Sequence, residues 1–488
     1  MNDVFVEHAL ELEEKYGDKE LAWNDPDFHQ FFVPKRSRWY KDASFTEEDE
    51  KNISPISVLT SNIGEGLDKA MAALEDHNSN LEGVLRNIVF NDKDKLKDKT
   101  LATLIKHYSK ISLGNKNLED PDILGRAYEY LIAQFADDAG KKGGEFYTPQ
   151  KVVELIVRLL KPTEGMRIND PTVGSGGFLI NTINYLRELR KKVGRDERDP
   201  PVDITLTGQE KNVNTWGICK MNLLLHGLPD ARIEKGDTIR DPKLIEGNQL
   251  MKFDRVMANP PFSLKNWGNE EAKADQESGF GRFRFGIPPK SYGDLAFLQH
   301  MYATLNDTGM LGIVMPHGVL FRGGAEGKIR QGLLEEDVIE AVIGLPANLF
   351  YGTGIPGCIL IINKNKPKTR ENKVLFIHAA EDYEEGKAQN FLRDQDIKKI
   401  VTTFEDFERI DKNGELEEYE RYARVVNKDE IVENDYILNI TRYVDTSEPE
   451  EEIDLEIAVK EWREAMTERD TATKVVEQYL EELGMGNE

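Results

Sequence analysis

The chain has 488 residues, which exceeds one ordinary domain and indicates two or three. Hydrophobic residues make up 39% and aromatic residues 9% of the sequence, enough to bury a core, so a disordered or fibrous protein is excluded. The formal net charge of −25 argues against a general nucleic-acid coat protein, because binding phosphates favours a positive surface.

The negative charge lies at the two ends of the chain. Residues 381–488 carry a net charge of −19 and residues 1–60 carry −7, which leaves +1 for residues 61–380. The two cysteines, Cys219 and Cys358, lie in apolar segments and indicate buried thiols rather than disulfides. With no signal-peptide pattern and no apolar run of membrane-spanning length, we expect a cytoplasmic protein without membrane contact.

The first region in chain order, residues 1–142, is predicted to be helical, because apolar residues recur there at steps of three and four. The glycine-rich segment Gly140–Gly144 then predicts a flexible joint and a domain boundary. A second region, 143–445, has a different pattern, in which short apolar runs alternate with helical segments. This alternation predicts an α/β fold with a mostly parallel sheet.

The elements expected in the second region are short strands separated by helices. The strands are Met166–Asn169, Ile204–Thr207, Arg232–Glu234, Phe253–Ala258, Met310–Val314, Val338–Gly344, Cys358–Ile362 and Val374–Ile377. The helices are Gly177–Leu189, Asn212–His226, Leu295–Leu305 and Ala325–Leu334. Residues 263–293 interrupt this alternation and predict a long functional or disordered loop. From residue 446 a charged helix is expected, with an apolar stripe between Ile453 and Leu483 that needs a partner surface.

A glycine-rich loop follows the first expected strand. It is the segment Asp170-Pro171-Thr172-Val173-Gly174-Ser175-Gly176-Gly177, and a helix begins at its end. Glycines allow a tight turn and a close approach of backbone to ligand. The spacing differs from dinucleotide-binding and Walker loops, and the preceding acid suits a cationic ligand group. A plain strand-to-helix turn is the competing interpretation.

Two acids occupy equivalent places after the next expected strands. Glu210 lies one βα unit beyond the glycine loop, where a carboxylate can bind ribose hydroxyls. Asp237 follows the next strand and can accept a hydrogen bond from an adenine amino group, or can instead cap a turn.

The most specific motif is Asn259-Pro260-Pro261-Phe262, directly after the strand Phe253–Ala258. The prolines end the strand and fix the backbone. The Asn259 side-chain oxygen and the Pro260 carbonyl then form two neighbouring acceptors, which suit a planar –NH2 group. Phe262 provides a face on which a flat base can stack.

The segment 263–293 interleaves basic and aromatic residues beside this motif. Candidate DNA contacts are the basic residues Lys265, Arg282, Arg284 and Lys290. An ordinary mobile loop, whose acids nearly cancel its bases, is the alternative. The eight histidines and two cysteines show no metal-ligand spacing, so no metal is expected.

Together, Asn259–Phe262, the glycine loop and the upstream Gly143-Gly144-Glu145-Phe146-Tyr147-Thr148-Pro149 resemble S-adenosylmethionine-dependent amino-methyltransferases of DNA, in the γ-arranged N6-adenine class. The helical front region, the length and the segment Val432–Tyr443 resemble the modification subunit of type I restriction–modification systems. The resemblance covers nearly the whole chain. It implies a Rossmann-like methyltransferase domain over 143–445, a helical domain over 1–142 and a helical partner-docking segment over 446–488.

The resemblance also implies roles for individual residues. Residues placed around the methionine end of S-adenosylmethionine are Glu145, Phe146, Tyr147, Thr148, Pro149, Gln150, Asp170, Pro171, Thr172, Gly174, Ser175, Gly176 and Gly177. Glu210 is then expected to bind the ribose and Asp237 the adenine of the cofactor. Asn259 and Pro260 would hold the target amine, Phe262 would stack on a flipped adenine, and Pro261 completes this catalytic motif.

Partners are implied as well, because the sequence shows no DNA-reading motif, Walker motif or nuclease constellation. The resemblance implies DNA, a specificity subunit with two copies of this chain, and a restriction subunit that can join. Two alternatives remain open at this point. One is a methyltransferase for a protein glutamine amide or an RNA guanine amine, and the other is a non-catalytic scaffold with the same fold.

Overall fold

The structure is a computed structural model, and it describes residues 1–118, 122–139, 147–196, 200–387, 389–412, 419–446 and 455–485. Two compact units are present, Met1–Asp445 and Thr446–Glu488. Within the described ranges, every helix is too short or too polar to cross a lipid bilayer. The joint predicted at Gly140–Gly144 lies outside the described residues, as do Glu145 and Phe146.

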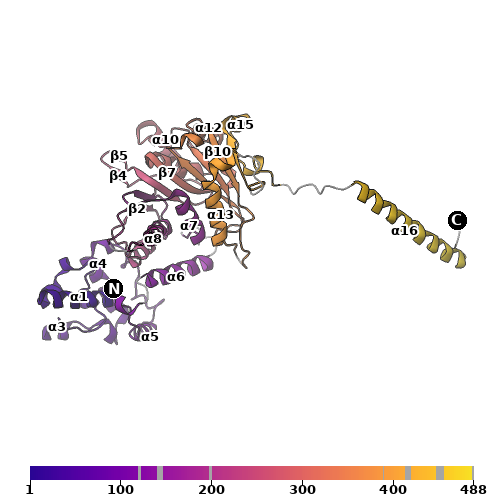
Figure 1. The fold of residues 1–488 in the computed structure, drawn as a ribbon. Coiled ribbons are helices and arrows are strands. Elements are labelled where there is room, and N and C mark those ends of the chain that lie inside the picture. The colour runs from indigo at the N-terminus through magenta and orange to yellow at the C-terminus, as the bar shows by residue number, and fades with distance from the viewer. Residues whose placement is uncertain are drawn as a thin grey trace. The chain divides into compact units, whose positions relative to one another are not determined.

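Helices build the N-terminal part of the first unit, as the apolar spacing predicts (Figure 1). They are α1 (Asn2–Tyr16), α2 (Lys19–Asn24), α3 (Glu47–Asn52), α4 (Ile63–His77), α5 (Asp98–Tyr108) and α6 (Ile123–Ala139). The helix α6 packs on α9 (Val213–Leu225) of the following region, where the Glu129 carboxylate lies 3.8 Å from the buried His226 ring. The helical region therefore contacts the region that contains the glycine loop.

A sheet of nine strands, counted over the described residues, forms the centre of the unit. The strands are β1 (Arg167–Asp170), β2 (Thr205–Glu210), β3 (Arg232–Lys235), β6 (Phe253–Ala258), β7 (Leu305–Pro316), β8 (Ile339–Gly344), β9 (Gly357–Asn363), β10 (Lys373–His378) and β11 (Ala423–Asn427). Their spatial order is β11-β10-β8-β9-β7-β6-β1-β2-β3, and a small hairpin of β4 (Ile245–Glu246) and β5 (Gln249–Leu250) lies outside the sheet.

The sheet is mostly parallel, as expected: β3, β2, β1, β6 and β7 run parallel to their neighbours in this order, and β8 runs parallel to β10. Two strands run the other way. Strand β9 is antiparallel to β7 and β8, and β11 is antiparallel to β10. Parallel neighbours usually need a crossover helix, and residues 345–356, which the structure describes throughout, contain none. The chain therefore returns directly from β8 to β9, and the sheet is mixed.

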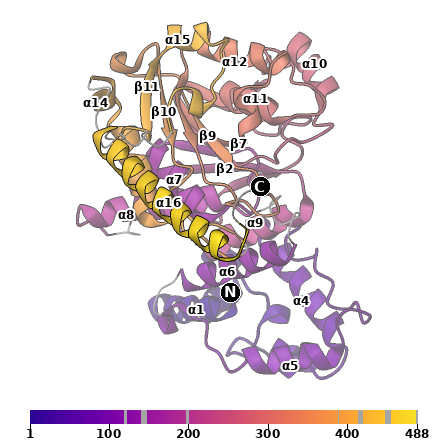
Figure 2. The same ribbon diagram turned by 90° about the vertical axis from the view of Figure 1, so that its right-hand side faces the viewer.

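Helices cover both faces of the sheet (Figures 1 and 2). One face packs against α7 (Gln150–Leu160), α8 (Gly177–Lys192), α9, α13 (Asp394–Glu405) and α14 (Phe407–Lys412). The other face packs against α11 (Asp294–Thr304), α12 (Ala325–Glu335) and α15 (Lys428–Glu433). Successive side chains of a strand point to opposite faces, and in β6 Val256 packs in one core and Met257 in the other. This is the layered α/β architecture that the sequence predicts.

Candidate functional site

The predicted motifs meet at the carboxyl ends of neighbouring parallel strands. The glycine loop follows β1, Glu210 ends β2, and Asp237 follows β3, while Asn259 follows β6 on the other side of β1. The chain thus builds β1, β2 and β3 outward and then returns to the opposite side of β1. Such a switch point opens a crevice at the strand ends, where open α/β sheets bind ligands.

The glycine loop needs glycine at two positions in this turn. Gly174 and Gly176 have φ angles of +53° and +89°, which other residues rarely adopt. A Cβ on Gly176 would lie 3.2 Å from the Cys219 sulfur beneath the loop. The Ser175 carbonyl accepts a hydrogen bond of 2.9 Å from Asn222 Nδ2 of α9. Buried groups of α9 therefore fix the loop from below, a role for Asn222 that no sequence motif indicated.

The two carboxylates nearest the loop are close enough to interact, and Asp170 is buried while Glu210 is partly buried. Asp170 Oδ1 accepts from the Thr172 amide at 3.0 Å, and Glu210 accepts from the Gly174 and Asn212 amides at 3.1 and 2.7 Å. Burial, reinforced by the Glu210 charge, raises the pKa of Asp170 to about 8. Burial also raises the pKa of Glu210. A cationic ligand group beside the two carboxylates would offset the free-energy cost of burying their negative charge.

Asp237 has a different environment. Its Oδ1 accepts from the Ile239 and Arg240 amides, and its Oδ2 lies 2.9 Å from Lys211 Nζ and 2.8 Å from Arg240 Nη1. These hydrogen bonds outweigh burial and lower the pKa of the Asp237 carboxyl. The residue caps a turn, which is one of the two roles that the sequence left open.

Asn259 lies beside the segment that precedes α7. Its Nδ2 donates to Thr148 Oγ1 at 3.1 Å, while its Oδ1 is buried without a hydrogen-bond partner in the described part of the chain. One pocket joins the motifs, and its lining consists of Tyr147, Thr148, Val153, Asp170, Thr172, Val173, Gly174, Ser175, Gly177, Phe178 and Asn259. Pro149 caps α7, whose first residue, Gln150, is exposed and not part of this lining.

Aromatic side chains from distant segments lie next to the proline motif. The Phe262 ring packs edge to face on Phe350 at a centroid distance of 5.5 Å, and Tyr147 packs similarly on Tyr351 at 5.6 Å. Phe350 and Tyr351 belong to the connection between β8 and β9. Sequence reasoning did not assign Phe350 and Tyr351 to the site, and their place in the segment directly after an expected strand was the one sequence feature that pointed to it.

Asp294, the first residue of α11, holds the turn that follows Phe262. Ser263 has a left-handed φ of +52°, and its amide donates to Asp294 Oδ1 at 2.7 Å. Asp294 is 1% exposed, and its Oδ2 accepts no hydrogen bond from any described residue while lying 3.8 Å from Arg322 Nη1. Burial raises the pKa of Asp294. We infer that Asp294 stabilises the turn and thereby fixes Phe262.

The segment 263–293 is largely ordered and packed rather than a structureless loop. It contains α10 (Asn269–Ser278), and the aromatic side chains of Trp267 and Phe283 are buried. Lys265 is exposed, and Lys290 pairs with Glu270. Arg284 is half exposed and pairs with Glu336. These three remain candidate DNA contacts.

The prediction of a DNA contact was wrong for Arg282. Its side chain is 3% exposed and pairs with Asp275 at 2.9 Å. It also donates to the carbonyls of Thr238 and Ile239 at 3.0 and 2.8 Å. The guanidinium has no access to phosphate, because it ties α10 to the turn after β3. Sequence alone could not distinguish this buried arginine from its exposed neighbours.

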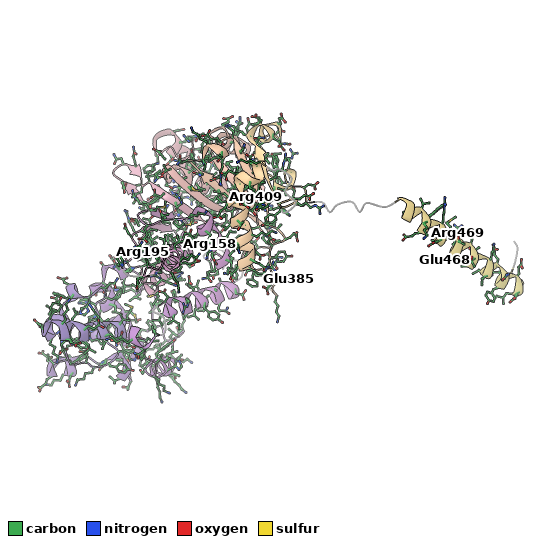
Figure 3. All side chains as sticks on the ribbon, in the orientation of Figure 1. Arg158, Arg195, Glu385, Arg409, Glu468 and Arg469 are labelled. Carbon is green, nitrogen blue, oxygen red and sulfur yellow. The ribbon has the colours of Figure 1, made fainter. Side chains whose placement is uncertain are left out.

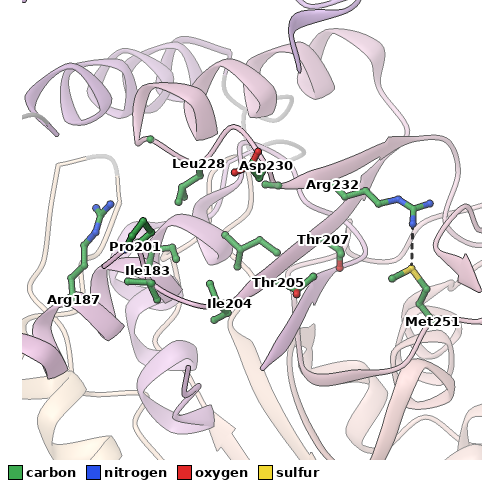
Figure 4. Close-up of a pocket in the computed structure, with 14 residues that line it drawn as sticks. Ile183, Arg187, Pro201, Ile204, Thr205, Thr207, Leu228, Asp230, Arg232 and Met251 are labelled. Carbon is green, nitrogen blue, oxygen red and sulfur yellow. Dashed lines mark hydrogen bonds between the residues drawn. The ribbon is translucent and has the colours of Figure 1, made fainter. Parts of the chain in front are cut away.

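A separate cavity of about 510 Å³ lies at the opposite, amino ends of β2 and β3 (Figure 4). Apolar side chains such as Ile183, Ile204 and Leu228 line much of it, and Arg232 donates to the Met251 sulfur at its edge. None of the predicted site residues lines this cavity. It therefore does not belong to the site at the carboxyl ends.

Comparison with known proteins identifies relatives over the full chain. A model of the N-6 DNA methylase family matches residues 119–452, and a model of the HsdM N-terminal domain matches residues 1–108. The type I restriction enzyme MjaIX methylase subunit of Methanocaldococcus jannaschii is 31% identical, with 98% of this chain and 85% of the relative covered. The HindI methylase subunit of Haemophilus influenzae is 32% identical over 86% of this chain and 91% of its own length.

A solved structure agrees with these sequence matches. The crystal structure of the type I restriction-modification system methyltransferase subunit from Streptococcus thermophilus is 32% identical to this chain. It superposes with a TM-score of 0.72 over 91% of this chain and 92% of its own. The helical front region and the α/β region are thus found together in this relative.

Proposed function

This chain belongs to the N-6 DNA methylase family, among the methylase subunits of type I restriction enzymes, and from this premise we propose how each part of the site acts. The chain transfers a methyl group from S-adenosylmethionine to the N6 amino group of an adenine in duplex DNA. One observation carries the assignment: Asn259 Oδ1, which is buried and has no hydrogen-bond partner among the described residues, shares a pocket with the glycine loop. A hydrogen-bond acceptor for an amine therefore lies beside the proposed cofactor pocket.

The residues present fit S-adenosylmethionine. Asp170 and the turn Gly174–Gly177 would hold its cationic amino-acid end, because no described residue supplies a counter-charge to the buried carboxylate. Glu210 retains free lone pairs for ribose hydroxyls, since a carboxylate can accept about four hydrogen bonds. Asp237 is engaged by Lys211 and Arg240, so an adenine contact there would add to an existing turn. When bound, the cofactor supplies an electrophilic sulfonium methyl group.

The chain's own residues would position the adenine. Asn259 Oδ1 and the Pro260 carbonyl accept the two N6 hydrogens, which aligns the nitrogen and draws its lone pair out of conjugation. Phe262, held by Phe350 and by the turn at Ser263, stacks on the flipped base. Holding both reactants in line supplies much of the rate, and the amine can lose its proton to water after attack.

The function is tested by co-expressing the chain with its specificity subunit and mapping modified bases in the host DNA. Tritiated S-adenosylmethionine should label duplex DNA at adenine N6 and leave RNA and protein acceptors unlabelled. Labelling of a protein glutamine amide or of RNA guanine would instead support the alternative substrates. A failure of the complex to bind S-adenosylmethionine in calorimetry would support the scaffold alternative.

Cofactor affinity should depend on pH through Asp170. Its pKa of about 8 lies above the ordinary value of 3.8, so between these values the free site holds a proton that an incoming ammonium must displace. We expect S-adenosylhomocysteine to bind more tightly as pH rises from 6 to 7.5, by up to about tenfold per unit, with proton release. Calorimetry in buffers of different ionisation enthalpy measures both quantities.

The control for this pH dependence is Asp170→Asn, which removes the titrating group while keeping the shape of the side chain. It should bind S-adenosylhomocysteine weakly and with a nearly flat pH profile. The same linkage makes the carboxylate destabilising, so the free chain should lose stability, not gain it, as pH rises from about 4 to 8. A wild-type affinity that is constant between pH 6 and 7.5 would contradict the assignment.

The second unit is proposed to bind the specificity subunit. It contains α16 (Leu455–Glu482), which exposes apolar residues in two groups on one face. Val459 and Trp462 form the first group, and Val476, Leu480 and Leu483 form the second, with Leu483 directly after the helix. The charged side chains of Glu468 and Arg469 stand on the same helix (Figure 3). An apolar stripe of this kind needs a partner surface, and two copies per specificity subunit together with a restriction subunit complete the proposed assembly.

Charge introduced into this stripe should prevent assembly. We expect Trp462→Glu combined with Leu480→Glu to lower co-purification of the specificity subunit at least about tenfold, because both side chains would be buried at the interface. Gln478→Glu is the matched control, since residue 478 lies on the opposite face of α16. S-adenosylhomocysteine binding should be unchanged in both variants. Undiminished co-purification with the double variant would exclude the stripe as the docking surface.

A further inference from the structure

Thr148 and Asn259 form a hydrogen bond whose direction decides what the site can accept. Asn259 Nδ2 donates to Thr148 Oγ1 at 3.1 Å, so Asn259 Oδ1 is the atom left without a partner in the part of the chain that the structure describes. If the amide were turned by half a rotation, its NH2 group would face the substrate instead. An NH2 group there would repel an incoming amine, because both would be donors.

The threonine hydroxyl permits either orientation by itself. It can accept from Nδ2, or it can donate its single hydrogen to Oδ1 of a turned amide. In the described structure the hydroxyl makes no hydrogen bond other than the one to Asn259. Its hydrogen is therefore available to a second acceptor. Thr148 also lines the pocket that the glycine loop forms, so such an acceptor can come from a ligand in that pocket.

We propose that Thr148 is a positioning residue that couples the two halves of the site. When the hydroxyl donates its hydrogen to the carboxylate of a bound cofactor, only its lone pairs face Asn259. Asn259 must then present Nδ2 to Thr148 and Oδ1 to the target amine. The amino-acid end of the cofactor thus selects the amide orientation that accepts adenine N6. This inference rests on the proposed function, because it assumes that the pocket holds the methionine end of S-adenosylmethionine.

The burial of the unpaired oxygen explains why such coupling is measurable. A buried acceptor without a partner is costly, but turning the amide would put the unpaired Nδ2 hydrogens in its place, so the Thr148 hydroxyl alone leaves both orientations accessible. Without a carboxylate ligand, the Thr148 hydrogen can satisfy Oδ1 in the turned orientation. With the carboxylate present that route is closed, and the target amine becomes the available donor. The affinity for the amine should therefore rise with the cofactor carboxylate and not with the nucleoside part alone.

The experiment uses the full chain in complex with its specificity subunit, and DNA that carries the recognition site mapped in host DNA. Two duplexes are compared, one with adenine at the target and one with purine, which lacks the N6 amine. The ratio of their Kd values isolates the amine contact. It is measured with saturating S-adenosylhomocysteine and again with saturating 5′-methylthioadenosine, which lacks the amino-acid moiety.

For the wild type, we expect the preference for adenine over purine to be about five- to tenfold greater with S-adenosylhomocysteine than with 5′-methylthioadenosine. In Thr148→Val, which keeps the shape and removes the hydroxyl, this difference should fall below about twofold. Thr148→Ser should restore it. Thr163→Val is the matched control, because it changes the same chemical group on an exposed residue outside this pocket. Thermal unfolding confirms that the variants are folded.

The proposal is overturned if Thr148→Val shows the wild-type difference, or if the two ligands act equally on the wild type. These outcomes are separate from a failure of the proposed function. A wild-type complex that binds no S-adenosylmethionine or methylates no adenine refutes the function itself. If the wild type methylates adenine and Thr148→Val keeps the full difference between the two ligands in its preference for adenine over purine, only the role of Thr148 is refuted.

Discussion

Replacing Asn259 with alanine should lower the rate of methyl transfer by at least about 100- to 1000-fold while cofactor binding persists. The substitution removes the buried acceptor for the target amine. It leaves the glycine loop, Asp170 and Glu210 in place, because their hydrogen bonds to described residues do not involve Asn259. Single-turnover methylation of the mapped DNA site measures the rate, and calorimetry with S-adenosylhomocysteine measures binding.

The matched control for this change is Asn248→Ala, which removes an exposed amide in the turn between β4 and β5. It should methylate at the wild-type rate. Asn259→Asp adds a second comparison, because it keeps an acceptor oxygen and loses the donor to Thr148. We expect its rate to lie between those of the wild type and Asn259→Ala. Near wild-type methylation by Asn259→Ala would show that the site assignment is wrong.

Replacing Arg282 with methionine should destabilise the fold by about 3–5 kcal/mol, since it leaves a buried carboxylate without its partner. The side chains of Arg282 and Asp275 are 3% and 6% exposed, and the guanidinium also satisfies two backbone carbonyls. Denaturant unfolding of the chain, followed by circular dichroism, measures the free energy of unfolding. Adding Asp275→Leu should recover part of the loss, because replacing both members of a buried pair costs less than breaking it.

Lys265→Ala is the counterpart on the same segment. Lys265 is exposed, so its removal should change the free energy of unfolding by no more than about 0.5 kcal/mol. If Lys265 contacts phosphate, its loss should weaken DNA binding by the complex. The slope of the logarithm of the binding constant against the logarithm of the salt concentration should then become shallower by about one. Unchanged stability in Arg282→Met would contradict the buried role derived from its contacts. If the Lys265→Ala complex bound DNA as tightly as the wild-type complex, Lys265 would be excluded as a DNA contact.

The sequence by itself determined the order of the elements and the local chemistry of the site. The strand Phe253–Ala258 and the helix beginning at Gly177 were predicted at the residues where they occur, because prolines and glycines mark their ends. The placement of Asp170, Glu210, Asp237 and Asn259 after strands was also predictable. Parallel strands bring their carboxyl ends to one edge, so residues far apart in sequence meet there in the structure.

Only the tertiary structure decided how those residues are partnered. Whether a polar side chain is exposed or buried depends on what packs over it, and sequence spacing on one element does not contain that information. Arg282 and Lys265 have similar local surroundings in sequence, yet Asp275 and two carbonyls enclose only the first. The bond from Asn259 to Thr148 spans 111 positions, and the Phe262–Phe350 contact depends on a β8–β9 return that periodicity did not predict. Local patterns fix local geometry, whereas the partners of a buried group are set by long-range packing.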